Sequence, residues 1–291
     1  MSLKKELTAC PLCSESLGRQ LYRFEPALWI PGQVIRCAGC GGIYKKPSEN
    51  ANPIADYYRD PRYHQLEYWS FEEHATRALR RIRDTVASAL GKTDSLSLLD
   101  IGCGPGEFLR LAQEIGFEAS GVELNAGNAE EARRRTCGAS VIRDDFMTAP
   151  FDRQFDVIAM LDLIEHLPDP LAAIRRTYEL LKPGGHLVVY TPNHSGITVR
   201  AADLVFRLSG GAIAGPVTEI FDCPHVVFFD VKSLRSALER NGFRVVKTAF
   251  SPYDPARNNQ ARGASAWGVR ALEAVGSVFL GQFRLLMLGR K

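Results

Sequence analysis

The 291-residue chain has no long apolar run and little net charge. No uninterrupted apolar stretch approaches the roughly 18 residues that a membrane helix requires. Residues Met1–Cys10 contain lysines but no apolar core of a signal peptide. These absences predict a cytoplasmic protein without a membrane span. The net charge of +3, with 24% charged residues, argues against nucleic acid or another polyanion as the partner.

The chain has seven cysteines, and the spacing of four of them is informative. Four of the seven cysteines form two C-x-x-C pairs separated by 23 residues: Cys10, Cys13, Cys37 and Cys40. Four thiolates so paired suit a tetrahedral Zn²⁺ site without an open position, so we expect structural zinc. Residues Leu21–Ile35 between the pairs predict the hairpin strands of a small ribbon, which we assign to residues 1–48. The alternative is four buried or redox-active cysteines.

A glycine-rich stretch, LLDIGCGPGEFL, spans Leu98–Leu109 and predicts a strand, a sharp turn and a helix start. Gly102, Gly104 and Gly106 lack Cβ atoms, so their backbone N–H groups can approach a ligand at the helix N-terminus. Such a turn can cradle a nucleotide-like cofactor. The GxGxG spacing differs from the G-x-G-x-x-G dinucleotide fingerprint, and a tight turn without a ligand is the alternative.

Acidic residues follow the next two expected strands. Glu123 ends the strand Phe117–Leu124, about 20 residues past the loop, where an acid accepts hydrogen bonds from ribose hydroxyls. Asp145 and Phe146 follow the third strand, where a carboxylate can take an adenine amino hydrogen beside an aromatic ring. A surface acid at a strand end is the alternative for Glu123.

The rest of the chain alternates between strand and helix patterns, which predicts a doubly wound parallel α/β sheet. Asp162, Glu165 and His166 follow the apolar fourth strand directly and are site candidates.

The aromatic segment from Tyr57 to Trp69 is either a lid or a connector packed on the core, within a helical region at 49–95. The loose pattern at 191–224 predicts an insertion that shapes the acceptor site. Further expected elements are the helices 70–90, 169–181, 197–208 and 231–240, the strands 155–161, 186–190, 243–250 and 282–291, and a core helix at 275–280.

These motifs together resemble the class I S-adenosylmethionine-dependent methyltransferases from about Leu96 onward. The resemblance rests on LLDIGCGPGEFL, GVELN, the DDF step, FDVIAMLDLIEHLPDP, LKPGGHLVV and HVVFFDVKSLRSALERNGF. It implies a Rossmann-like seven-stranded sheet whose last strand is antiparallel, in a methyltransferase domain at 49–291. RCAGCGGIYKKP followed by DYY resembles members with an N-terminal zinc ribbon, often linked with sugar, surface-polysaccharide or natural-product modification. GGIYKKP departs from that subgroup's usual residues, and no long C-terminal domain follows.

The resemblance also implies roles for single residues. Asp100 and the turn Gly102, Gly104 and Gly106 would hold the methionine part of S-adenosylmethionine. Glu123 would bind the ribose, Asp145 and Phe146 would meet the adenine, and the backbone of Leu161 would reach the methionine portion.

Methyl transfer needs an acceptor held in line, because the sulfonium already activates the methyl group. A hydroxyl acceptor also benefits from a base with a pKa near neutral, which points to histidine. His166 and His225 are the candidates, and His194 is a third. The alternatives are a structural His166 in the EHL step and a His225 packed on Phe228.

We therefore predict O-methylation of a small-molecule or saccharide-like acceptor. The rival is N- or C-methylation, including that of RNA; the modest charge and the lack of an N/D-P-P-aromatic motif after the fourth strand argue against RNA. A non-catalytic zinc-ribbon interaction protein and a nicotinamide oxidoreductase are alternatives from other classes. The acceptor and the oligomeric state are not assigned by the sequence.

Overall fold

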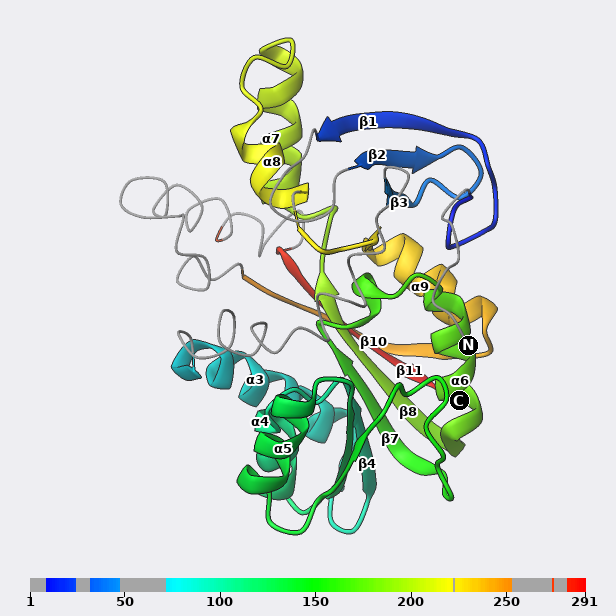
Figure 1. The fold of residues 1–291 in the computed structure, drawn as a ribbon, viewed down its shortest axis with the longest axis vertical. Helices are drawn as coiled ribbons and strands as arrows, with labels where there is room; N and C mark the ends of the chain where they lie inside the picture. Colours follow the sequence, from blue (N-terminus) through cyan, green and yellow to red (C-terminus); the bar gives the residue numbers. More distant parts are fainter. Residues whose placement is uncertain (1–8, 25–31, 48–71, 222, 253–273, 275–281) are drawn as a thin grey trace.

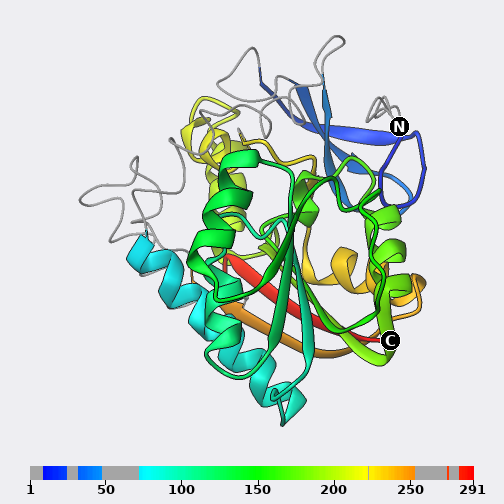
Figure 2. The same ribbon diagram turned by 60° about the horizontal axis from the view of Figure 1, so that its bottom comes forward.

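The computed structural model describes residues 9–24, 32–47, 72–221, 223–252, 274 and 282–291. Their strands form two sheets, one of seven strands and one of four. The four-stranded sheet and helix α3 (Glu72–Leu90) lie far apart in both ribbon views (Figures 1 and 2). The predicted aromatic segment 57–69, the start of the helix at 70–71 and the core helix at 275–280 lie outside the described residues.

The seven-stranded sheet has the order β10-β11-β8-β7-β4-β5-β6. The five strands from β8 to β6 pair in parallel, whereas β11 runs antiparallel to both β8 and β10. The predicted doubly wound sheet with an antiparallel last strand is confirmed. The strands are β4 (Ser97–Ile101), β5 (Glu118–Glu123), β6 (Ser140–Arg143), β7 (Phe155–Leu161), β8 (Leu181–Pro192), β10 (Arg244–Ser251) and β11 (Arg284–Arg290).

Helices cover both faces of this sheet, because side chains alternate between the faces along each strand. Leu98 packs with α3, α4 (Glu107–Gln113) and α5 (Ala126–Arg135), whereas the adjacent Leu99 packs with α6 (Pro170–Leu180) and α9 (Val231–Arg240). Side-chain caps begin three of these helices: Asn125 for α5, Asp169 for α6 and Asp230 for α9. The result is a three-layer α/β core, with helices on both faces of the sheet (Figure 1).

The second sheet joins the N-terminal strands to a segment from the other end of the chain. Its order is β1 (Gly18–Phe24), β2 (Gly32–Cys37), β3 (Ile43–Pro47) and β9 (Val227–Phe228). Ile43 pairs with Phe228 and Tyr44 with Val227. The expected ribbon strands are present, but β3 and β9 were not predicted. The ribbon sheet therefore includes a strand from outside residues 1–48.

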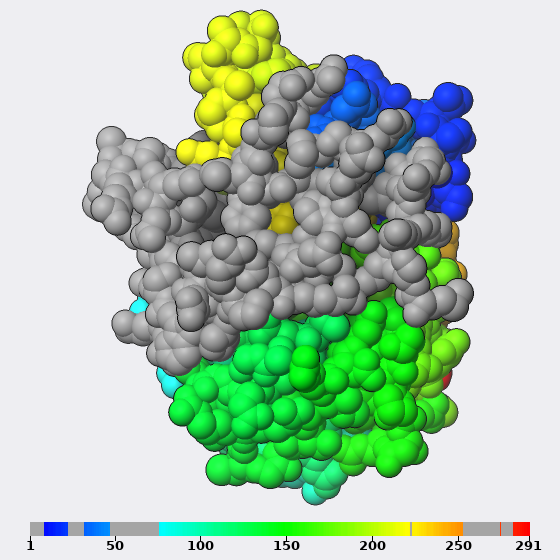
Figure 3. Space-filling model, in the orientation of Figure 1, coloured from blue at the N-terminus to red at the C-terminus, as the bar shows by residue number. Residues whose placement is uncertain are grey.

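The segment between β8 and β9 forms a helical hairpin that packs on the ribbon sheet. Helices α7 (Ile197–Leu208) and α8 (Gly215–Phe221) stand out from the body of the molecule beside the ribbon strands (Figure 3). Tyr22 of β1 donates a hydrogen bond to Asp203 of α7, and its ring contacts Phe206 and Phe221. No helix among the described residues is long and apolar enough to span a bilayer.

Candidate active site

The glycine-rich turn between β4 and α4 has the left-handed backbone that its glycines allow. Gly102, Gly104 and Gly106 have φ values of 70°, 52° and 84°. A Cβ on Gly106 would lie 2.9 Å from the Cα of Ala132 in α5, so a side chain there would push the helix away. The turn is thus conformationally restricted to glycine and brings α4 close to α5.

Glu123 lies beside this turn. One carboxylate oxygen accepts a hydrogen bond from the Gly104 amide at 2.9 Å, and the other accepts from the Asn125 amide at 2.7 Å. Burial raises the pKa of Glu123, while these amide hydrogen bonds act in the opposite direction. Ionised carboxylate oxygens accept more than one hydrogen bond, so the side chain can also accept from ribose hydroxyls.

A pocket opens beside the turn at the carboxyl ends of β4, β7 and β8. Asp100 is 3% exposed, and its Oδ1 has no hydrogen-bond partner in the described part of the chain. Burial, and then the charge of Glu123, raises the pKa of Asp100 well above its ordinary value. A cationic ligand group would satisfy this oxygen. The pocket is lined by Ala78, Leu79, Asp100, Gly102, Cys103, Pro105, Glu107, Phe108, Leu161, Asp162 and Tyr190.

The two predicted adenine-binding residues follow β6 at the same sheet edge as Glu123. Glu123 pairs with Arg143, two residues before Asp145. The Asp145 carboxylate accepts from the Met147 amide at 3.0 Å. Phe146 is 6% exposed and packs in the core on the α6 side of the sheet. Contact with adenine at these two residues remains a prediction.

A polar cluster lies beyond the end of β7, in the short helix η1 (Ile164–His166) and the segment before β9. One ligand atom from each of Glu165, His166 and His225 lies within 4.8 Å of the other two. The rings of His166 and His225 are 4.7 Å apart, and the His194 ring is 6.4 Å from that of His225. The sequence indicated these side chains one by one, but not that they converge.

The electrostatics of this cluster follow from its burial. Burial, and then the charge of Asp162, raises the pKa of Glu165 to about 8. Burial lowers the pKa of both His166 and His194 to about 4. Burial, with the neighbouring His166, lowers the pKa of His225 well below its ordinary value. The imidazoles are therefore neutral at pH 7, and a neutral ring nitrogen can accept a proton or bind a cation.

Backbone hydrogen bonds hold the cluster against the ribbon sheet. The Val226 amide donates to the Glu165 carbonyl at 2.8 Å, and the Val226 carbonyl accepts from the Lys45 amide at 2.8 Å. The Lys45 side chain is 1% exposed and donates from Nζ to the Cys223 carbonyl at 2.8 Å. Strand β3 thus helps to position His225. Sequence reasoning missed Lys45, because nothing local indicates which strand will pair with β3.

Asp162 connects the pocket to the cluster. It lines the pocket, lies three residues before Glu165 and has a positive φ of 51°. Its carboxylate forms an ion pair with Arg284 of β11, whose guanidinium lies 5.3 Å from the centre of the Tyr190 ring. Sequence reasoning also missed Arg284, which is 122 residues away from Asp162 in the chain.

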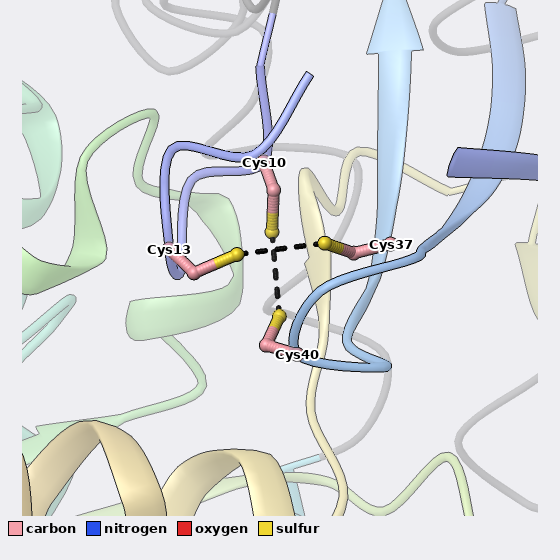
Figure 4. A group of neighbouring side chains, drawn as sticks. All are labelled: Cys10, Cys13, Cys37 and Cys40. Atoms are coloured by element: carbon pink, nitrogen blue, oxygen red, sulfur yellow. Dashed lines mark hydrogen bonds between the residues drawn. The ribbon is translucent and has the colours of Figure 1, made fainter. Parts of the chain in front are cut away.

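The four predicted cysteines form one compact group, here called the four-cysteine group (Figure 4). Cys10 and Cys40 have their sulfur atoms 3.6 Å apart, and Cys13 and Cys37 have theirs 3.4 Å apart. All four are free thiols. Tetrahedral zinc with bonds of about 2.3 Å places its sulfur ligands about 3.8 Å apart, so the group fits the ion. Burial raises the pKa of Cys37, but backbone and thiol hydrogen bonds outweigh it and lower that pKa to about 7.

A family model described as a methyltransferase domain matches residues 69–248. The chain belongs to this methyltransferase family. With the observed sheet, the match makes the chain a class I S-adenosylmethionine-dependent methyltransferase, as the sequence motifs predicted.

Curated relatives share the enzyme class. A ubiquinone biosynthesis O-methyltransferase from Xanthomonas campestris pv. campestris (strain B100) is 29% identical over 181 residues, covering 55% of this chain and 74% of the relative. Its counterpart from Ruegeria pomeroyi is 34% identical over 121 residues, covering 38% of this chain and 49% of the relative. The match to the one from Alkalilimnicola ehrlichii covers 48% of that protein. The chain thus spans about half the length of these last two relatives.

Solved structures share the fold. A chain of the complex between the Haloferax volcanii Trm112 methyltransferase activator and a putative methyltransferase has a TM-score of 0.53 and 14% identity, covering 82% of this chain and 98% of that chain. Magnesium protoporphyrin IX methyltransferase from Synechocystis PCC 6803, with bound SAH, has a TM-score of 0.53 and 12% identity, covering 82% and 97%. At these identities the likeness concerns the fold alone.

Proposed function

We propose that this methyltransferase transfers the methyl group of S-adenosylmethionine to a hydroxyl oxygen of a small-molecule acceptor. The observation that carries the proposal is the position of the Glu165, His166 and His225 cluster, which begins three residues after Asp162 in the lining of the pocket that contains Asp100. The names of the curated relatives favour oxygen over nitrogen or carbon as the acceptor atom. A saccharide or natural-product hydroxyl is the more specific form of the proposal.

The cofactor-binding residues have separate roles in this proposal. Asp100 faces the charged methionine end, and the N–H groups of the glycine-rich turn line the same part of the site. Glu123 accepts from the ribose hydroxyls, Asp145 and Phe146 meet the adenine, and the backbone of Leu161 reaches the methionine portion. The pocket supports the placement of Asp100, the glycine-rich turn and Leu161, because these residues line it together.

The chemistry is an in-line displacement. The acceptor oxygen attacks the methyl carbon, the carbon–sulfur bond breaks, and S-adenosylhomocysteine leaves as the hydroxyl proton is lost. His225 Nδ1 has no hydrogen-bond partner among the described residues, and His166 contacts the Pro224 carbonyl through Nδ1 at 3.2 Å. The neutral His225 ring therefore has a nitrogen that can promote proton loss.

The four-cysteine group supports a second part of the proposal, a structural zinc ion in the ribbon. We assign the ribbon to residues 1–48 and the methyltransferase domain to 49–291, with 191–224 shaping the acceptor side. A site saturated by four thiolates leaves no position for substrate, so the ion would stabilise the ribbon sheet and, through β3, the segment that carries His225.

The proposal is tested first by titrating the protein calorimetrically with S-adenosylmethionine. A labelled-methyl assay on panels of phenols, sugars and amines follows, and the products identify the acceptor atom. Binding together with an O-methylated product supports the proposal. A folded protein that binds no S-adenosylmethionine, or one that methylates only amines, overturns it.

A further inference from the structure

Arg284, the first residue of β11, lies at the edge of the sheet where the parallel strands end. Because β11 runs antiparallel to β8, Arg284 pairs with Pro192, the last residue of β8. Ligands of α/β sheets bind at this edge. The guanidinium forms an ion pair with Asp162 and lies 5.3 Å from the centre of the Tyr190 ring, and both of these residues line the pocket. Arg284 is therefore one side chain away from the pocket.

The protein uses only part of this guanidinium. An arginine has five N–H donors, yet among the described residues Arg284 forms a hydrogen bond only through Nη1, to Asp162. Its side chain is 16% exposed, so the donors on Nε and Nη2 are not sealed in the core. The centres of the Tyr190 and Phe283 rings lie 5.3 and 5.9 Å from the guanidinium carbon and help to hold the group in place. The Nε–Nη2 edge is thus held in position with donors for a ligand.

The acid and the histidines that respond to the charge of Arg284 are mostly uncharged at pH 7. Burial, and then the charge of Asp162, raises the pKa of Glu165 to about 8, so this acid is largely protonated. Burial lowers the pKa of the three histidines discussed above, and the charge of Arg284 lowers each of them further. Burial alone would lower the pKa of Arg284, but the charge of Asp162 outweighs it and raises that pKa. Arg284 therefore stays protonated beside neutral groups.

We propose that Arg284 binds an anionic group of the acceptor, so that the substrates of this methyltransferase are hydroxyl compounds that carry a carboxylate or a phosphate. The methyl transfer itself rests on the proposed function, to which the inference adds a substrate class. Two parallel N–H groups match two oxygens of either anion, and such charge-assisted pairs are among the strongest hydrogen bonds in proteins. With its acidic group on the Nε–Nη2 edge of Arg284, an acceptor can direct its hydroxyl toward the pocket.

Asp162 sets the strength of this anion site. Its carboxylate occupies Nη1 and offsets part of the guanidinium charge, so it opposes the approach of a second anion. The same carboxylate fixes the guanidinium beside the pocket that Asp162 lines. The two residues therefore have opposite effects on the affinity for an anion, a relationship that a purely structural ion pair would not produce.

The test is a calorimetric titration of the full-length protein, with S-adenosylhomocysteine bound, with sodium acetate and with inorganic phosphate in separate experiments. The bound product fills the cofactor site, so that the anions cannot occupy it. We expect saturable binding with a dissociation constant in the millimolar range. The anion that binds more tightly identifies the acidic group of the acceptor as a carboxylate or a phosphate.

Two variants and a matched control locate the anion. Arg284→Met keeps an unbranched apolar side chain but removes the charge and the donors, and it should weaken anion binding at least about tenfold. Asp162→Asn removes the opposing charge and should tighten binding. Arg290→Met changes the exposed arginine at the other end of β11 and should leave binding unchanged. A cooperative melting transition shows that each variant is folded.

The outcomes separate this inference from the proposed function. Weaker binding by Arg284→Met together with tighter binding by Asp162→Asn establishes the site, whether or not an acceptor is found. A folded wild type that binds neither anion at high millimolar concentrations, or an Arg284→Met variant that binds as the wild type does, overturns it. If Arg284→Met does not fold, Asp162→Asn decides, because unchanged or weaker binding by that variant contradicts the site.

The labelled-methyl assay then tests the substrate class. Hydroxy acids and sugar phosphates are each compared with a neutral counterpart, and we expect the acidic member of a pair to be the better acceptor for the wild type but not for Arg284→Met. Products formed from neutral alcohols alone would refute the substrate class and leave the proposed function standing. A protein that binds neither S-adenosylmethionine nor S-adenosylhomocysteine refutes the proposed function, while titration of the cofactor-free protein with the two anions still decides the site.

Discussion

The backbone amide of Gly104 donates a hydrogen bond of 2.9 Å to the carboxylate of Glu123, so the turn and the acid at the end of β5 form one unit. Glu123→Ala removes this contact together with the proposed acceptor for the ribose hydroxyls. Hydrogen bonds to a charged group contribute about 1.5–3 kcal/mol, so we expect affinity for S-adenosylmethionine to fall about 10- to 100-fold.

Calorimetric titration measures this loss, with Glu118→Ala as the matched control. Glu118 starts the same strand and its side chain is 61% exposed. An unchanged affinity in Glu123→Ala, or an equal loss in Glu118→Ala, would contradict the assignment.

Asp100→Asn is expected to raise the folding stability of the protein and to weaken its binding of S-adenosylmethionine. The raised folded pKa of Asp100 means that the folded state binds more protons than the unfolded state between the ordinary aspartate pKa and the raised one. Its contribution to the free energy of unfolding is therefore full below the ordinary pKa and declines as pH rises through the folded pKa. Asparagine cannot ionise, so the variant is more stable than the wild type at pH 8 and equally stable at low pH.

Urea unfolding of both proteins without cofactor, across this pH range, measures the difference. S-adenosylmethionine binding by Asp100→Asn should be weaker than that of the wild type where Asp100 is ionised, because the carboxylate that faces the cationic end of the cofactor is gone, and the difference should shrink at low pH, where Asp100 is protonated. A variant that is less stable than the wild type at pH 8 would refute the prediction.

Gly106→Ala tests how closely α4 approaches α5. The added Cβ is strained by the positive φ and also lies 2.9 Å from the Ala132 Cα. Gly138→Ala is the control, since Gly138 has a φ of 71° but no heavy atom within 4 Å of its ideal Cβ. The left-handed backbone alone costs about 1–2 kcal/mol. Gly106→Ala should cost more than Gly138→Ala and also weaken cofactor binding, as unfolding and titration experiments on both variants will show.

Cys37→Ser tests the ribbon metal. Elemental analysis should find about one zinc per wild-type chain and none in this variant. Loss of a structural metal costs on the order of 5 kcal/mol, which lowers the melting temperature by on the order of 10 °C. Cys137→Ser, at an exposed cysteine outside the group, should change neither quantity. A Cys37→Ser variant that keeps its zinc would rule out the four-cysteine site.

The cofactor-binding part of the site was predictable, because its residues lie close together in the sequence. The three glycines and the acid of β5 lie within about 20 residues, and parallel strands place their carboxyl ends at one edge. The acceptor side depends on contacts between distant segments. Arg284 reaches Asp162 from the last strand, and β9 has only two residues, too few for a periodicity that indicates its partner. The convergence of Glu165, His166 and His225 follows from that pairing, so the sequence indicated the residues but not the cluster.

The pairing of β3 with β9 also has a consequence for synthesis of the protein. Ile43 and Phe228 are register partners, so the ribosome must add 185 residues after Ile43 before its partner exists. At roughly 5–20 residues per second this takes about 10 to 40 seconds. Throughout that time β3 presents an open edge to other nascent chains, a template for mispairing. The ribbon strands β1 to β3 are thus made well before their last partner β9, and a metal captured early by the cysteines would protect them during the delay.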